Sequence, residues 1–177
     1  MFNACFTGHR KISNSYYNPE NPTPEWAALK EYMRHVVGTL VANNITLFYS
    51  GMAIGVDMLA AEVVLEIKAA FPQIALHAAV PFPSQPSNWP KATQDRYYSI
   101  LSQCNITHTI NQDPYTPWKM HARDRFMVDN SQYVVSVWDG NPGGGTYYTT
   151  RYAQEVKRMI FRVNPLTITG AWLEEDI

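Results

Sequence analysis

Four short segments carry most of the residues in this chain that could contact a ligand, and each follows an apolar run that predicts a β-strand. Glycines let backbone N–H groups approach an anion closely, and a helix that begins directly after such a loop adds partial positive charge. The residues therefore favour recognition of phosphate and ribose. The segments are Thr7-Gly8-His9-Arg10, Ser50-Gly51-Met52-Ala53-Ile54-Gly55-Val56-Asp57, Pro81-Phe82-Pro83 and Asp139-Gly140-Asn141-Pro142-Gly143-Gly144-Gly145-Thr146.

The two longer loops are not the familiar nucleotide motifs. Neither contains the Gly-Lys-Ser/Thr of a Walker A loop, and neither reads Gly-x-Gly-x-x-Gly, so a P-loop enzyme and a nicotinamide dehydrogenase are both disfavoured. Glycine-rich turns that only connect elements are the alternative for either loop. Two such loops at corresponding positions, each leading into a predicted helix, favour a binding site.

Individual side chains suggest how a ligand would be held. Arg10 could bind a phosphate with two hydrogen bonds, with a surface ion pair as the alternative. Asp57 could accept hydrogen bonds from ribose hydroxyls or cap its helix, and Trp89 with Phe82 could cover a base or pin the proline-rich loop. For arginines on predicted helices, the alternative to a ligand contact is a position on the solvent-exposed face of the helix. The predicted ligand-binding residues are Gly8, His9, Arg10, Ser50, Gly51, Gly55, Asp57, Pro81, Phe82, Trp89, Arg96, Arg123, Asp139, Gly143, Gly144, Gly145 and Thr146.

The elements that must position these residues alternate along the chain. Strands that alternate with helices imply right-handed crossovers and a mainly parallel sheet covered on both faces, whose carboxyl ends meet at one edge. We therefore predict an α/β fold, a single Rossmann-like three-layer domain over 1–177. The expected strands are 2–7, 45–49, 74–80, 106–110, 133–138 and a last one from 161–163 with 166–168; the expected helices are 24–42, 56–71, 91–104, 118–130 and 146–159.

Composition narrows the class of protein. The 177 residues are 46% hydrophobic and only 16% charged, which excludes a disordered chain. The net charge of −1 argues against nucleic acid and anionic lipid as partners. The aromatic content of 13% suggests a pocket or a homo-oligomer interface as well as a core.

No residue pattern calls for a metal or a required cofactor, and the two cysteines, Cys5 and Cys104, read as free buried thiols. The N-terminal residues lack a signal peptide, and no apolar run approaches the ~20 residues of a membrane span. We expect a cytoplasmic protein without a membrane segment.

Several motifs resemble one superfamily. Ser50-Gly51-x-x-x-Gly55-Val56-Asp57-x-x-Ala60-Ala61-Glu62 resembles the glycine loop of the SLOG superfamily of DprA/Smf-like and Lonely Guy-like Rossmann proteins. The segments 7–10, 123–131 and 139–146 resemble its YpsA-like branch. The resemblance implies a Rossmann fold that binds a nucleotide or a nucleotide-derived ligand, in some members as a sensor or effector of bacterial and phage conflict systems.

One departure from the Lonely Guy-like pattern bears on activity. Those enzymes cleave nucleoside monophosphates with a loop Pro-Gly-Gly-x-Gly-Thr-x-x-Glu, whereas this chain has a loop one residue shorter and Thr149 where the Glu would stand. A threonine cannot stabilise an oxocarbenium-like sugar or activate water as a carboxylate does. Binding is therefore favoured over hydrolysis.

Three functions remain for comparison. The first is a sensor or sequestering protein that binds a nucleotide-type small molecule at the C-terminal edge of the sheet. The second is an N-glycoside hydrolase that has moved its carboxylate to Asp57, Asp139 or Asp124. The third is single-stranded DNA binding as in DprA, which the sparse and dispersed Lys and Arg residues count against.

Overall fold

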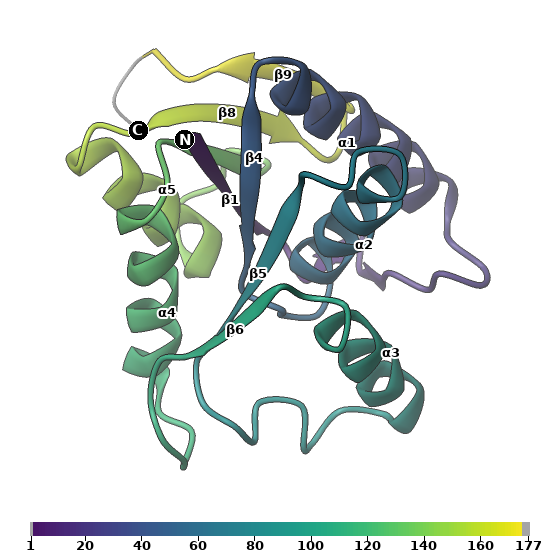
Figure 1. Cartoon of the computed structure of the whole chain (residues 1–177), viewed down its shortest axis with the longest axis vertical. Helices are drawn as coiled ribbons and strands as arrows, with labels where there is room; N and C mark the ends of the chain where they lie inside the picture. Colours follow the sequence, from purple (N-terminus) through teal and green to yellow (C-terminus); the bar gives the residue numbers. More distant parts are fainter. Residues whose placement is uncertain (1, 175–177) are drawn as a thin grey trace.

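A computed structural model describes residues 2–174 and is built around a 7-stranded sheet with the order β6-β5-β4-β1-β7-β8-β9 (Figure 1). All neighbouring strands are parallel except β8 and β9, which are antiparallel. The predicted α/β Rossmann-like fold is therefore confirmed. The strands of this sheet are β1 (Phe2–Gly8), β4 (Ile45–Ser50), β5 (Ala75–Val80), β6 (Ile106–Thr109), β7 (Tyr133–Val137), β8 (Met159–Asn164) and β9 (Thr169–Trp172).

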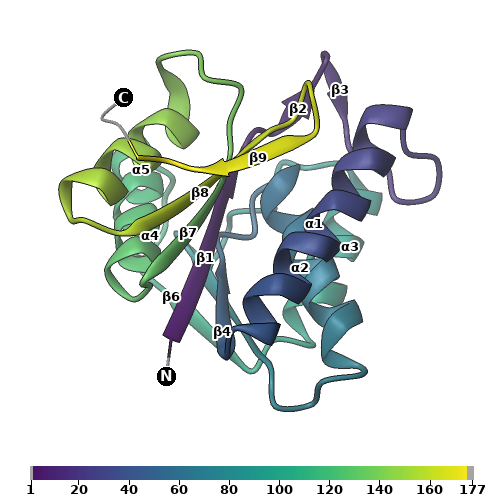
Figure 2. The ribbon, with the colours of Figure 1, turned by 90° about the horizontal axis from the view of Figure 1, so that it is seen from above.

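Helices cover both faces of the sheet, which explains why its central strands are apolar on both sides. Ala4, Cys5 and Phe6 are consecutive in β1 and all fully buried. The helices α1, α2 and α3 lie on one face, and α4 and α5 lie on the other (Figures 1 and 2). Their bounds are α1 (Pro24–Ala42), α2 (Val56–Lys68), α3 (Lys91–Leu101), α4 (Pro117–Asp129) and α5 (Gly144–Glu155).

The strand order creates a switch point beside β1. From β1 the chain moves outward through β4, β5 and β6, and then returns to place β7 and β8 on the other side of β1. Open parallel sheets bind ligands at such a switch, beyond the carboxyl ends of the strands. The loops after β1, β4 and β7 all lie at this edge, as the sequence predicted.

Three short strands were not predicted. The strands β2 (Lys11–Ile12) and β3 (Ser15–Tyr16) form a small antiparallel hairpin, and two-residue strands carry no periodicity. The last strand was expected from 161–163 with 166–168, whereas the structure has β8 over Met159–Asn164 and the separate strand β9, which returns along β8 and pairs Gly170 with Val163. In the described part of the chain, no helix is long and apolar enough to cross a membrane.

Candidate functional site

The loop after β1 packs directly on the turn that begins α2. The Val56 amide donates to the His9 carbonyl at 3.2 Å. A Cβ on Gly8 would lie 2.5 Å from the Val56 Cβ, and a Cβ on Gly55, whose φ is +96°, would lie 2.6 Å from the Arg10 Cα. The two glycines therefore permit the close approach of two backbone segments.

Two amides of the turn between β4 and α2 donate to side chains of the same turn. The Met52 amide donates to Ser50 Oγ at 3.1 Å, and the Ala53 amide donates to Asp57 Oδ2 at 3.4 Å. Ser50 Oγ in turn donates to the Asp57 carbonyl at 2.8 Å. Ser50, Gly51 and Asp57 are buried, so this predicted phosphate cradle is filled by the protein's own groups.

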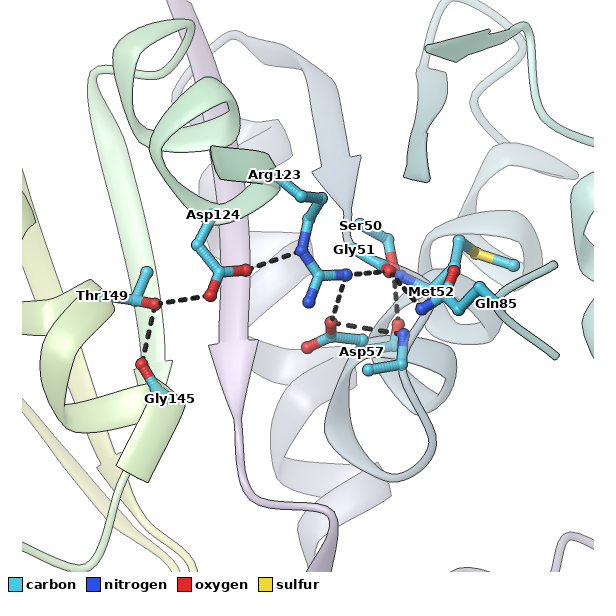
Figure 3. Close-up of polar contacts among 10 residues, drawn as sticks. Ser50, Gly51, Met52, Asp57, Gln85, Arg123, Asp124, Gly145 and Thr149 are labelled. Carbon is cyan, nitrogen blue, oxygen red and sulfur yellow. Dashed lines mark hydrogen bonds and ion pairs between the residues drawn. The ribbon is translucent and has the colours of Figure 1, made fainter. Parts of the chain in front are cut away.

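Arg123 joins this turn to α4 and α5 in a buried network (Figure 3). Its guanidinium donates to the Gly51 carbonyl and, at 2.6 Å, to Asp124 Oδ1, and it lies 3.8 Å from Asp57 Oδ2. The hydroxyl of Thr149 lies 3.1 Å from Asp124 Oδ2 and 2.8 Å from the Gly145 carbonyl, so its single proton can satisfy one of them at a time. Arg123, predicted to contact ligand, is therefore committed to holding three elements together.

The charge of this network is unbalanced. One arginine lies between two carboxylates, Asp57 and Asp124, and their side chains are 7% and 14% exposed. Burial raises the pKa of Asp57 from 3.8 to about 6, and the attraction of Arg123 offsets only part of that effect. Arg10 also acts on Asp57 electrostatically and lowers its pKa, which places a further cation near the network.

The loop between β7 and α5 differs from the first two because it is open. Gly143, Gly144 and Gly145 are exposed, and a Cβ on any of them would meet no heavy atom within 4 Å. Among the described residues, no acceptor outside the helix is recorded for the first amides of α5, at Gly144, Gly145 and Thr146. Gly144 and Gly145 therefore present free amide donors to solvent, whereas Thr146 is buried.

Polar side chains from the loops after β1 and β7 meet beside this open loop. His9 Nε2 lies 3.3 Å from Asp139 Oδ1 and accepts from the Asp139 amide at 3.3 Å. Partial burial raises the pKa of Asp139, but hydrogen bonds from Asn141 and the nearby His9 outweigh it, and the net shift is downward. Arg10 is exposed, and no carboxylate partner is recorded for it among residues 2–174. Arg10 is therefore a cation available at the edge of the sheet.

Several predicted contacts lie away from this opening. Arg96 makes two hydrogen bonds to Glu62, at 2.6 and 2.9 Å, between α2 and α3. The Trp89 ring packs edge-on against Tyr97 at 5.5 Å. Phe82, only 5% exposed, packs against Tyr115, and Pro81 is buried beside it. The predicted aromatic wall over a base is thus engaged in packing.

The structure also adds a buried side chain and a cavity that the predicted ligand-binding residues do not include. Gln85 is buried, its amide nitrogen donates to the Gly51 carbonyl at 3.4 Å, and its Oε1 has no hydrogen-bond partner among residues 2–174. A cavity of about 670 Å³ lies between α4 and α5. Exposed aromatic residues at helical spacing were the available signal for it. Its lining includes Trp118, His121, Arg125, Tyr147, Tyr148 and Tyr152.

Comparison with known proteins connects the fold to others. Residues 4–169 match the YspA SLOG family. A UPF0398 protein of Brevibacillus brevis is 27% identical over 163 residues, covering 89% of this chain and 86% of that protein.

Two solved structures of DNA processing protein A (DprA) share the fold. That of Streptococcus pneumoniae superposes with a TM-score of 0.62 at 17% identity over 92% of this chain. That of Helicobacter pylori superposes with a TM-score of 0.54 at 21% identity, also over 92%. The chain spans 50% and 65% of their respective lengths.

This comparison corrects one expectation. The Helicobacter pylori structure is described as showing a single-stranded DNA binding mode. The expectation that nucleic acid is not a partner is therefore wrong, because the net charge does not exclude it. A net charge averages over the whole chain, whereas contacts with phosphates depend on the cations of one face.

Proposed function

Because the chain belongs to the YspA SLOG family, we propose that it binds a nucleotide or nucleotide-derived ligand at the C-terminal edge of its sheet, as a sensor or a sequestering protein. The observation that carries this proposal is the open turn at Gly143–Gly145. It lies at the switch point of the sheet, its glycines face open space and its amides lack acceptors among the described residues. Free amides at a helix N-terminus favour an anion such as a phosphate.

The contrast between the two glycine loops supports this location. The amide that begins α2 already donates to the His9 carbonyl, and Asp57 accepts from the same turn. The phosphate is therefore assigned to the first turn of α5, with Arg10 as the additional cation. Asp57 would act beneath the ligand through its charge and not through direct contact with ribose.

Binding without cleavage is supported by the state of the carboxylates. Asp57 and Asp124 share Arg123, and Asp139 accepts hydrogen bonds from both the amide and the side chain of Asn141 at 3.0 Å. The position that corresponds to the Lonely Guy-type glutamate holds Thr149, whose hydroxyl contacts Asp124. The hydrolase alternative predicts release of free base from a nucleoside monophosphate, which chromatography of the reaction mixture would detect.

The experiment that tests the proposal combines ligand identification with a matched pair of variants. Mass spectrometry of small molecules released from the denatured protein, followed by calorimetric titration of nucleotides and cyclic dinucleotides, should identify a ligand. Gly145→Pro removes one amide donor at a helical position where proline is tolerated, whereas Gly145→Ala keeps it. We expect Gly145→Pro to weaken binding by about tenfold or more, as for a lost hydrogen bond to a charged group, and Gly145→Ala to bind like the wild type.

Two outcomes would contradict the proposal. One is the absence of both a retained ligand and measurable binding across the panel. The other is equal binding by Gly145→Pro and Gly145→Ala, which would place the anion elsewhere. Arg10→Gln should weaken binding, and Lys91→Gln, a side chain 81% exposed on α3, is its control.

A second candidate function is binding of single-stranded nucleic acid. It is supported by the DNA-binding description of the Helicobacter pylori structure and by the exposed aromatic and arginine side chains between α4 and α5. Base stacking on aromatic rings beside cations is how many proteins hold single strands. Titration of a labelled oligonucleotide at low and high salt separates this function from binding of a free nucleotide.

A further inference from the structure

A groove between α4 and α5 begins beside the proposed phosphate site. Both helices start at the C-terminal edge of the sheet, because α4 follows β6 and α5 follows β7 in parallel crossovers. The groove encloses about 670 Å³, within the range of small-molecule sites. Tyr147 and Tyr148 line it and closely follow Gly145, the last exposed glycine of the open turn.

The groove contains two kinds of aromatic ring. Those of Tyr152 and Tyr147 already face cations, with the Arg125 Cζ 4.7 Å from the first ring and the Arg151 Cζ 6.0 Å from the second. The ring of Trp118 on α4 has the Lys119 Nζ 5.8 Å from its centroid, and that of Tyr148 on α5 packs edge-on against His121 at 5.9 Å, yet the two residues remain 58% and 55% exposed. Two largely exposed rings therefore lie on the two helices that form one groove, next to cationic side chains.

The lining indicates the class of ligand. Among the described residues that line the groove there is no Leu, Ile, Val or Met, and Ala122 is the aliphatic exception. An amphipathic helix or an acyl chain requires an aliphatic surface, which is absent from this lining. The lining holds two carboxylates, Asp124 and Glu155, as well as two arginines, so its flat aromatic rings, and not its charge, favour a planar ring as the ligand.

We propose that the base of a free nucleotide stacks on Trp118 and Tyr148 in the α4–α5 groove. This inference rests on the proposed function, since a phosphate at the first turn of α5 brings the rest of the nucleotide to the mouth of the groove. It replaces Phe82 and Trp89, which pack inside the fold, as the aromatic surface for the base. Arg125 holds the Tyr152 ring and adds positive charge along the wall.

The test compares ligands that have a base with one that lacks it. Calorimetric titration uses ATP, GTP, CTP and UTP, and inorganic triphosphate as the ligand without a base. Trp118→Ala and Tyr148→Ala should each weaken the best nucleotide by ~5-fold to ~150-fold, the range for loss of one stacked base, and leave triphosphate binding unchanged. Tyr98→Ala is the control, because Tyr98 is 53% exposed on α3, on the opposite face of the sheet.

The outcomes separate the base site from the proposed function. The base site would be overturned if Trp118→Ala and Tyr148→Ala bind nucleotides with wild-type affinity. The phosphate site would still stand in that case, provided that triphosphate competes with the nucleotide. Absence of binding by every nucleotide and by triphosphate would overturn both. A ten-residue oligothymidylate provides the third outcome. If it binds more tightly than any mononucleotide, and this binding is lost in the same variants, the groove binds a single strand and the proposal of a free nucleotide is overturned. Cooperative thermal unfolding of each variant verifies that the fold is intact.

Discussion

Asp57→Asn should remove a pH-dependent loss of stability that is specific to the buried network. Asp57 is 5% exposed, and its pKa rises from 3.8 to about 6 because burial outweighs the attraction of Arg123. The folded protein therefore holds the proton over a range in which the unfolded chain has released it. Stability from this group is present below the unfolded pKa and is lost as pH rises through the folded pKa.

The magnitude follows from the two pKa values. At 1.36 kcal/mol per pH unit, the full difference corresponds to about 3 kcal/mol, and the part lost between pH 5 and pH 8 is about 1.4 kcal/mol. Urea denaturation at pH 5, 6, 7 and 8 measures the free energy of unfolding of the wild type and of Asp57→Asn. We expect the free energy of unfolding of Asp57→Asn, relative to that of the wild type, to rise by that amount from pH 5 to pH 8.

The comparison with a variant isolates this group from others that titrate nearby. His77, whose pKa is lowered by burial and by His108, changes charge in both proteins and cancels in the difference. Asp95→Asn, at a side chain 59% exposed, should leave the pH dependence of the wild type unchanged. Parallel stability curves for the wild type and Asp57→Asn would refute the argument that burial holds this carboxyl partly protonated.

Three further predictions concern the same fold. Gly51→Ala should destabilise the fold by ~1–3 kcal/mol, because the added Cβ overlaps the Arg123 guanidinium. Gly38→Ala, whose added Cβ meets nothing within 4 Å, should stabilise α1 by ~0.5–1 kcal/mol. Equal urea midpoints for the two variants would contradict this. Arg123→Met should cost ~3–5 kcal/mol in unfolding free energy at pH 7, because it leaves the buried Asp57 and the partly buried Asp124 without their cation. The variant should recover stability at pH 5; a cost independent of pH would oppose the electrostatic reason. Burial raises the pKa of Cys5 to about 12, so this thiol should react with a thiol reagent at pH 8 only when the protein unfolds. Burial raises the pKa of Cys104 to about 11, so this thiol should react slowly. Rapid labelling of both cysteines in the folded protein would disprove this prediction.

The elements were predictable where periodicity is local. The apolar spacing and Pro24 predicted α1 over the residues that the structure shows, and the apolar run 133–138 predicted β7 to within one residue. A glycine-rich break followed by a helix was also predicted after β7, but the expected helix 146–159 begins two residues earlier and ends four residues earlier, as α5 over Gly144–Glu155. These features depend on contacts between residues a few positions apart.

The roles of the two glycine loops could not be separated by sequence. Both read as open phosphate cradles, yet the first is closed by the His9 carbonyl and by Arg123, which lies 72 residues from Gly51. Trp89 and Phe82 are likewise turned into the fold by partners on other elements.

The sequence by itself determined the alternation of strands and helices and the glycine-rich loops that follow the strands. It also placed a threonine at position 149, where the Lonely Guy-type loop has its glutamate. Only the tertiary structure decided which helix N-terminus is free, which arginine is available and which aromatic rings remain exposed. The physical reason is that a donor, a cation or a ring is available only if no other segment has satisfied it, and those segments meet through long-range packing.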